Sequence, residues 1–113
     1  MAAAISYKKG RRIRILVGEG QMWQGRPLYQ TIVDAARQYG VLRVVVFRGI
    51  EGFGPEHHLS TDRIVDISEN LPMVIDIIER EERIASLLPI LDRSIKQGII
   101  TMTAIDIVVD AEL

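Results

Sequence analysis

Strand-sized apolar runs alternate along this chain with two segments of helical periodicity, and this alternation limits the possible folds most. The strand-sized runs are short and rich in β-branched residues, and they cover residues 12–17, 41–48, 73–79 and 99–109. Apolar residues recur at helical spacing from Leu28 to Tyr39, and Gly40 is placed to end that helix. The same spacing recurs from Glu81 to Lys96. The predicted order is therefore β-α-β, a loop, and a second β-α-β.

Two such halves combine into a ferredoxin-like βαββαβ fold of the α+β class, an antiparallel four-stranded sheet with both helices on one face. Pro27 is expected at the first helical position, and Pro89 is expected to kink the second helix. The run from Val41 to Arg48 is apolar at nearly every position, which is typical of a strand covered on both faces, so we place it centrally. Because two helices cover only one face, we expect other subunits to pack on the second face.

Length and composition narrow the functional classes. The 113 residues suit one domain, residues 1–113. Fourteen basic and fifteen acidic side chains leave a net charge of -1, so we expect no nucleic-acid partner. The absence of cysteine excludes disulfides, thiolate metal sites and a cysteine nucleophile. No apolar run approaches the roughly 20 residues that span a bilayer, so the expected location is cytoplasmic.

One segment, residues 49–63, departs from the rest of the chain in composition. It contains three glycines, one proline, two histidines and four charged side chains, which predicts a long exposed loop. Long loops in compact domains are usually functional or disordered. Residues 64–67 are expected to form a short edge strand or one arm of this loop.

Four stretches resemble the DUF190 (UPF0166) family of small PII-like proteins, namely Val17-Gly18-Glu19, Gly25 to Tyr29, Arg48 to Gly54 and Leu71 to Val74. Gly52-Phe53-Gly54 is also similar to the base of the long loop in nitrogen regulatory PII proteins. The resemblance implies a PII-like homotrimer whose inter-subunit clefts bind AMP, ADP or ATP. It also implies a mobile loop that signals to a partner protein, for which a membrane transporter is one candidate. ADP or AMP is favoured, because Lys96-Gln97-Gly98 stands where PII has a glycine-rich phosphate loop.

The nucleotide-binding residues expected from this resemblance are Glu19, Arg48, Gly49, Gly52, Phe53, Gly54, Arg63, Lys96 and Gly98. The glycines let backbone N–H groups approach a phosphate or a base, although a flexible turn is the simpler explanation. The two arginines, which bracket the loop, either hold phosphate oxygens or form ion pairs with Glu51 or Asp62. Glu19 either accepts hydrogen bonds from a ribose or an adenine amino group, or is a solvated loop acid. Phe53, between two glycines, is expected to be exposed unless it packs on a base or a neighbouring subunit.

The sequence gives weaker indications of metal binding and of catalysis. His57 and His58 are weak metal-ligand candidates, because adjacent histidines point in opposite directions on an extended chain. A metal-binding or enzymatic trimer of the same fold would use them with Glu56 and Asp62. No nucleophile with a positioned base is recognisable, so we assign no catalytic residue and expect no enzyme. Trp23 is either a stacking platform or a packing anchor.

Overall fold

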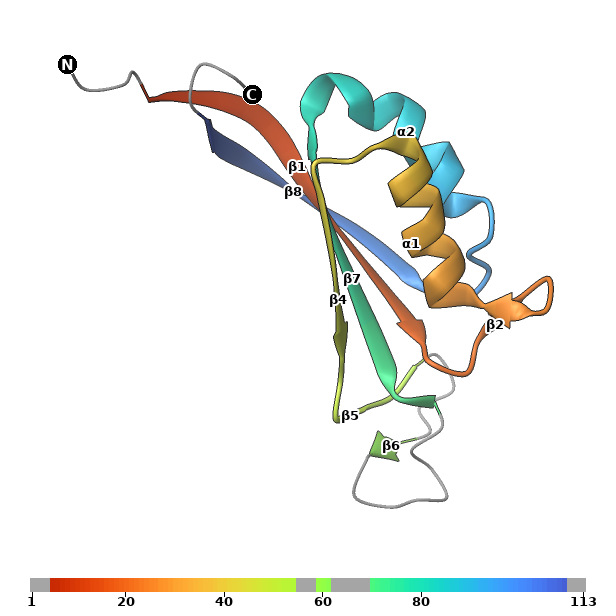
Figure 1. The fold of residues 1–113 in the computed structure, drawn as a ribbon. Helices are drawn as coiled ribbons and strands as arrows, with labels where there is room; N and C mark the ends of the chain where they lie inside the picture. The colour runs from red at the N-terminus through yellow and green to blue at the C-terminus, as the bar shows by residue number, and fades with distance from the viewer. Residues whose placement is uncertain (1–4, 55–58, 62–69, 110–113) are drawn as a thin grey trace.

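The computed structural model describes residues 5–54, 59–61 and 70–109. In this part of the chain, two α-helices lie against one face of a four-stranded sheet (Figure 1). The elements in chain order are β1 (Ser6–Gly18), β2 (Met22–Trp23), β3 (Arg26–Pro27), α1 (Leu28–Tyr39), β4 (Arg43–Arg48), β5 (Glu51–Gly52), β6 (Ser60–Thr61), β7 (Pro72–Arg80), the 3₁₀ turn η2 (Glu81–Arg83), α2 (Ile84–Asp92) and β8 (Ile99–Val109).

The four long strands are antiparallel and lie in the order β4-β7-β1-β8. This order confirms the predicted ferredoxin-like fold. In the central pair, Ile13 of β1 lies opposite Ile77 of β7, and Ile15 lies opposite Ile75. The register also brings the ends of β1 and β4 to the same end of the sheet as the starts of β7 and β8. Segments far apart in sequence therefore meet at this end.

The hydrophobic core lies between the central strands and the two helices. Alternate residues of β1 and β7 point towards the helices, as the period of two along a strand requires. The core side chains, each at most 7% exposed, are Ile13, Ile15, Val17, Leu28, Ile32, Ala36, Met73, Ile75, Ile77, Ile84, Leu87 and Leu91. Burying one large aliphatic side chain contributes about 1.5–3 kcal/mol, so this layer is the main source of stability.

The helix boundaries follow from local backbone chemistry. Gly40 ends α1 in the left-handed conformation, with φ of 82°, and its N–H donates to the carbonyl oxygens of Ala36 and Arg37. Pro27 is the N-cap of α1, one residue before the first helical position that we predicted for it. The second helix was expected to reach Lys96 but ends at Asp92, three residues after Pro89. Neither helix is long and apolar enough to cross a membrane.

The position of β4 corrects a prediction. The strand lies at the edge of the sheet, next to β7, rather than at its centre. Val45 is 48% exposed and Phe47 is 54% exposed, so the described residues leave one face of β4 largely uncovered. An apolar pattern on both faces shows that a strand is meant to be covered, but it does not show whether a helix or another chain provides the cover.

A small hairpin, β2–β3, precedes α1, and no strand was predicted there. Met22 pairs with Pro27, and Trp23 pairs with Arg26. The turn uses two residues with positive φ, Gln24 at 49° and Gly25 at 80°. The hairpin places Trp23 against the core beside α1.

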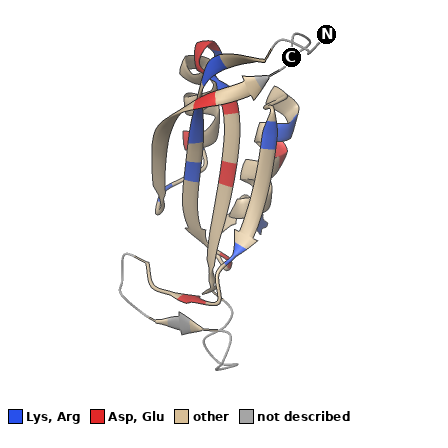
Figure 2. Ribbon diagram, turned by 90° about the vertical axis from the view of Figure 1, so that its left-hand side faces the viewer, with Lys and Arg blue, Asp and Glu red and all other residues tan. Residues whose placement is uncertain are grey.

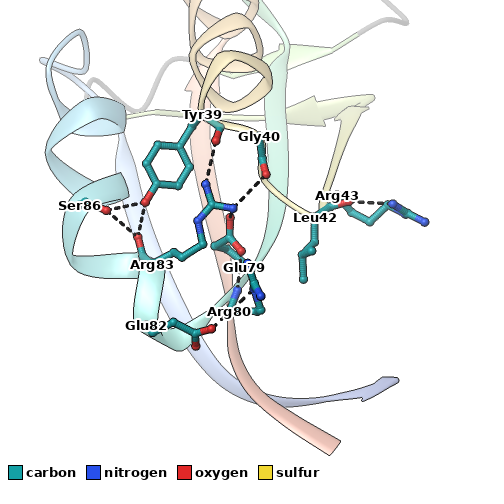
Figure 3. Close-up of polar contacts among 9 residues, drawn as sticks. All are labelled: Tyr39, Gly40, Leu42, Arg43, Glu79, Arg80, Glu82, Arg83 and Ser86. Carbon is teal, nitrogen blue, oxygen red and sulfur yellow. Dashed lines mark hydrogen bonds and ion pairs between the residues drawn. The ribbon is translucent and has the colours of Figure 1, made fainter. Parts of the chain in front are cut away.

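A partly buried polar cluster joins α1 to the end of β7 (Figure 3). Arg83 donates from Nη2 to the carbonyl oxygen of Tyr39 at 2.8 Å, and its guanidinium lies 4.5 Å from the centre of the Tyr39 ring. Its Nη1 lies 3.4 Å from Oε2 of Glu79, a side chain with no solvent exposure. The hydroxyl of Tyr39 bonds to the carbonyl oxygen of Arg83 and to Ser86. This cluster joins the end of α1 to the start of α2. It lies at the end of the sheet opposite the end that carries Glu19 and Arg48.

Candidate functional site

An ion pair between Glu19 and Arg48 is the main charged contact among the predicted site residues. Arg48 ends β4 and Glu19 follows β1, and these two strands are separated in the sheet by β7. Arg48 Nε lies 2.7 Å from Glu19 Oε2, and Arg48 Nη2 lies 3.1 Å from Glu19 Oε1. The side chains are 50% and 26% exposed, so a charged ligand has access to this pair.

The glycines after β4 pack closely on the start of β7. The N–H of Gly49 donates to the carbonyl oxygen of Pro72 at 2.7 Å. A Cβ on Gly49 would lie 2.6 Å from Pro72 Cγ, and a Cβ on Gly52 would lie 2.9 Å from the same atom. Gly54 differs, because a Cβ there would meet no atom within 4 Å. The close approach to Pro72 explains why glycine stands at positions 49 and 52. A side chain at position 54 would meet no such obstacle.

Two amide side chains, which sequence reasoning missed, join the loops at this end of the sheet. Gln21 Oε1 accepts a hydrogen bond from the N–H of Gly18 at 2.6 Å, and its Nε2 donates to the carbonyl oxygen of Gln97 at 2.7 Å. Asn70 Oδ1 accepts from the N–H of Gly20 at 2.9 Å. Glutamine and asparagine are common in polar loops, so no sequence signal distinguished these two.

The connection between α2 and β8 supplies the other predicted residues. A Cβ on Gly98 would lie 2.9 Å from the carbonyl oxygen of Leu16, so glycine permits the close approach of this connection to β1. The ammonium group of Lys96 lies 5.8 Å from the centre of the Trp23 ring. Lys96 therefore faces the β2–β3 hairpin, and the backbone of Gln97 next to it is tied to the end of β1 through Gln21.

The structure thus brings Glu19, Arg48, Gly49 and Gly52 to one end of the sheet, with Gly98 beside β1. Phe53 follows them and is 64% exposed. Arg63, Glu56, His57, His58 and Asp62 lie outside the described residues, as does the predicted strand at 64–67. Among the described residues, no three or more acidic or histidine side chains gather closely enough to hold a metal ion.

The sheet face opposite the helices is exposed and contains one central ion pair. Figure 2 views the sheet from this side. The register places Arg12 and Arg43, both opposite Ile78, on the same face as this pair. Arg14 of β1 and Asp76 of β7 lie directly opposite each other and form two hydrogen bonds of 2.8 Å. The hydrogen bonds and charge of Arg14 lower the pKa of Asp76 below its ordinary value of 3.8. Apolar neighbours on this face include Val45, Phe47 and Ile99, each close to half exposed or more.

Comparisons with known proteins identify similar sequences over most of the chain. The DUF190 family model, described as Uncharacterized ACR, COG1993, matches residues 10–107. A UPF0166 protein of Aquifex aeolicus is 27% identical over 100 residues, which cover 88% of this chain and 94% of that protein. A UPF0166 protein of Methanocaldococcus jannaschii is 32% identical over 96 residues, which cover 84% and 88%, respectively.

Solved structures share the fold. CPII from Thiomonas intermedia K12, bound to ADP and bicarbonate, matches with a TM-score of 0.65 at 15% identity, covering 94% of this chain and 93% of that one. The same protein, a nitrogen regulatory PII-like protein, bound to ADP, AMP and bicarbonate, gives a TM-score of 0.63 at 14% identity, covering 94% and 92%. The predicted PII-like fold is therefore confirmed.

Proposed function

This chain belongs to the DUF190 family, and on that basis we propose that it is a PII-like regulatory protein that binds ADP or AMP in clefts between subunits. The observation that carries the proposal is the meeting of Arg48, Glu19 and the glycines after β4 at one end of the sheet. A guanidinium at this position is suited to phosphate oxygens, and glycine permits close approach of a ligand to the backbone. The complexes of CPII with ADP and AMP support this choice of ligand.

The proposed assembly is a homotrimer in which the exposed sheet faces pack together. Apolar side chains on this face, such as Phe47 and Ile99, are more than half exposed in the single chain. Large apolar side chains that are exposed on one face are typical of a protein interface, and the charged residues Arg12, Arg43 and Asp76 on the same face would lie among them. Burial of this face between copies would place the end of β4 next to a neighbouring subunit and so complete each cleft.

The proposed output is a change in the loop that follows β4. Ile50 and Phe53 at its base are 70% and 64% exposed, and they offer apolar contacts to a partner protein. Nucleotide bound beside Arg48 would favour one arrangement of this loop over others and so change its affinity for that partner. In this proposal the protein binds ligands and does not catalyse a reaction. It acts in the cytoplasm, and a membrane transporter is one candidate for its partner protein.

Isothermal titration calorimetry tests the ligand. The full chain is titrated separately with ADP, AMP and ATP, and we expect saturable heat from ADP and AMP and weaker binding of ATP. Guanosine diphosphate is the matched control for the base. An absence of heat from all adenine nucleotides at about 100 μM protein would contradict the proposal, because it excludes dissociation constants in the usual regulatory range.

A further inference from the structure

A hollow of about 350 Å³ lies between the β2–β3 hairpin and the connection from α2 to β8. This volume falls at the lower end of the range for small-molecule sites, about 300–1,000 Å³. Its apolar lining includes Met22, Trp23 and Leu28, and its polar lining includes Gln21, Ser94 and Lys96. Arg48 and Glu19 do not line it.

The walls of the hollow are held in place by hydrogen bonds. Gln21 donates to the carbonyl oxygen of Gln97, which joins the hairpin side to the α2–β8 connection. The N–H of Leu28 donates to the carbonyl oxygen of Gln21 at 2.8 Å, which fixes the start of α1 against the same segment. Trp23 also packs against the hydrophobic core. A site with fixed walls loses little conformational entropy when a ligand binds.

The lining combines an aromatic ring with a single charge. The Lys96 ammonium lies 5.8 Å from the centre of the Trp23 ring, and among the described residues that line the hollow it is the only charged group. Indole rings stack well with planar groups, and an ammonium on a flexible stem reaches a carboxylate readily. Ser94, 8% exposed, adds a hydroxyl group to the lining.

We propose that this hollow binds a small planar organic anion, such as an aromatic carboxylate, with its ring on Trp23 and its carboxylate at Lys96. The single positive charge of Lys96 is matched better by a ligand with one negative charge than by a nucleoside diphosphate, which carries several. The site is separate from the nucleotide cleft proposed above, and it assigns Lys96 to a different ligand. The two sites share the segment around Gln21, which contacts both Gly18 and Gln97.

The chain contains one tryptophan, so the fluorescence of Trp23 reports on this hollow directly. Benzoate serves as the probe, benzamide as the uncharged analogue with the same ring, and cyclohexanecarboxylate as the charged analogue without a planar ring. We expect a saturable change in fluorescence with benzoate. Both analogues should bind at least about tenfold more weakly than benzoate. A linear, unsaturable response, or equal affinity for all three compounds, would overturn the proposal.

Two variants test the role of Lys96. Lys96→Gln should weaken benzoate binding about tenfold and leave benzamide binding unchanged, since only benzoate carries the charge. Lys8→Gln, an exposed lysine of β1, makes the same charge change away from the hollow and should have no effect. Equal benzoate affinity in Lys96→Gln and the parent would contradict the assignment.

A titration in the presence of ADP separates this proposal from the nucleotide proposal. Benzoate binding that is unchanged by saturating ADP supports two sites. Competitive displacement of benzoate by ADP would overturn the separate site and assign the hollow to the nucleotide. If ADP gives no heat while benzoate still saturates the fluorescence change, the nucleotide proposal fails and this one stands.

Discussion

Arg48, at the end of β4, reaches across the start of β7 and holds Glu19, at the end of β1, through two hydrogen bonds of 2.7 and 3.1 Å. The two residues are 29 positions apart, and only the strand order brings them together. The carboxylate occupies the Nε–Nη2 edge of the guanidinium, which can also hold two oxygens of a phosphate. In the proposed site, a phosphate that takes this edge would compete with the ion pair.

The two members of the pair should affect ADP affinity in opposite directions. Arg48→Gln should weaken ADP binding about tenfold to a hundredfold, since charge-assisted hydrogen bonds contribute about 1.5–3 kcal/mol. Glu19→Gln should strengthen it by up to about fivefold, because a competing exposed ion pair is worth at most about 1 kcal/mol. Calorimetric titration measures both. Arg43→Gln, at the far end of β4, is the matched control and should leave ADP binding unchanged. Weaker ADP binding in Glu19→Gln would contradict the competition and show that the carboxylate contacts the nucleotide itself.

Two glycines of the loop base should respond differently to a methyl group. Gly49→Ala places a Cβ 2.6 Å from Pro72 Cγ and 3.1 Å from the Pro72 carbonyl oxygen, so it should lower the free energy of unfolding by about 1–3 kcal/mol. Gly54→Ala meets no atom within 4 Å and should change stability by less than about 0.5 kcal/mol, while weakening ADP binding. Urea denaturation and calorimetry measure these effects. Equal stability of the two variants would show that the Gly49 contact with Pro72 relaxes without cost.

The cluster at the opposite end of the sheet should contribute to stability alone. Arg83→Ala removes the hydrogen bond to the Tyr39 carbonyl oxygen and the cation beside buried Glu79. We expect a loss of about 2–3 kcal/mol in unfolding free energy, because a buried carboxylate is left without its partner charge. Arg37→Ala, on the exposed last turn of α1, should cost less than about 1 kcal/mol. Equal losses in the two variants would exclude a special role for Arg83.

The Arg14–Asp76 pair should make stability sensitive to acid. Because Arg14 lowers the pKa of folded Asp76 below 3.8, the pair contributes its full stabilisation above that pH and loses it as the pH falls through the lowered value. Urea denaturation between about pH 5 and pH 2 should therefore show a decline that Asp76→Asn reduces. Asp34→Asn should reduce the decline as well, because hydrogen bonds from Gln30 and Arg26 lower the pKa of Asp34 and link its ionisation to stability in the same way. An unchanged pH dependence in Asp76→Asn would contradict this assignment.

Periodicity was sufficient to predict the main elements and their order. The spacing of Leu28, Ile32 and Ala36 identified α1, and these residues are buried as expected. The β-branched runs identified the four long strands, since alternation with helices allowed few topologies. Local signals of this kind depend on neighbours in sequence, and so they can be read from one chain.

The parts that sequence reasoning missed depend on contacts between distant segments. The central placement of β4 was wrong because the apolar residues around Val45 do not indicate what covers them. Sequence reasoning considered Arg48 only with Glu51 and Asp62, which are near in sequence, and so it missed the ion pair of Arg48 with Glu19. The role of Gln21 follows from three loops meeting at one end of the sheet, which no local pattern encodes.

The central claim is that copies of this chain form a trimer with a nucleotide in each cleft between subunits. Native mass spectrometry of the full chain with added ADP counts subunits and ligands in one measurement. The account predicts a trimer that binds up to three ADP molecules and loses them in Arg48→Gln while remaining trimeric. A monomer that binds one ADP, or a trimer that binds none, would contradict it.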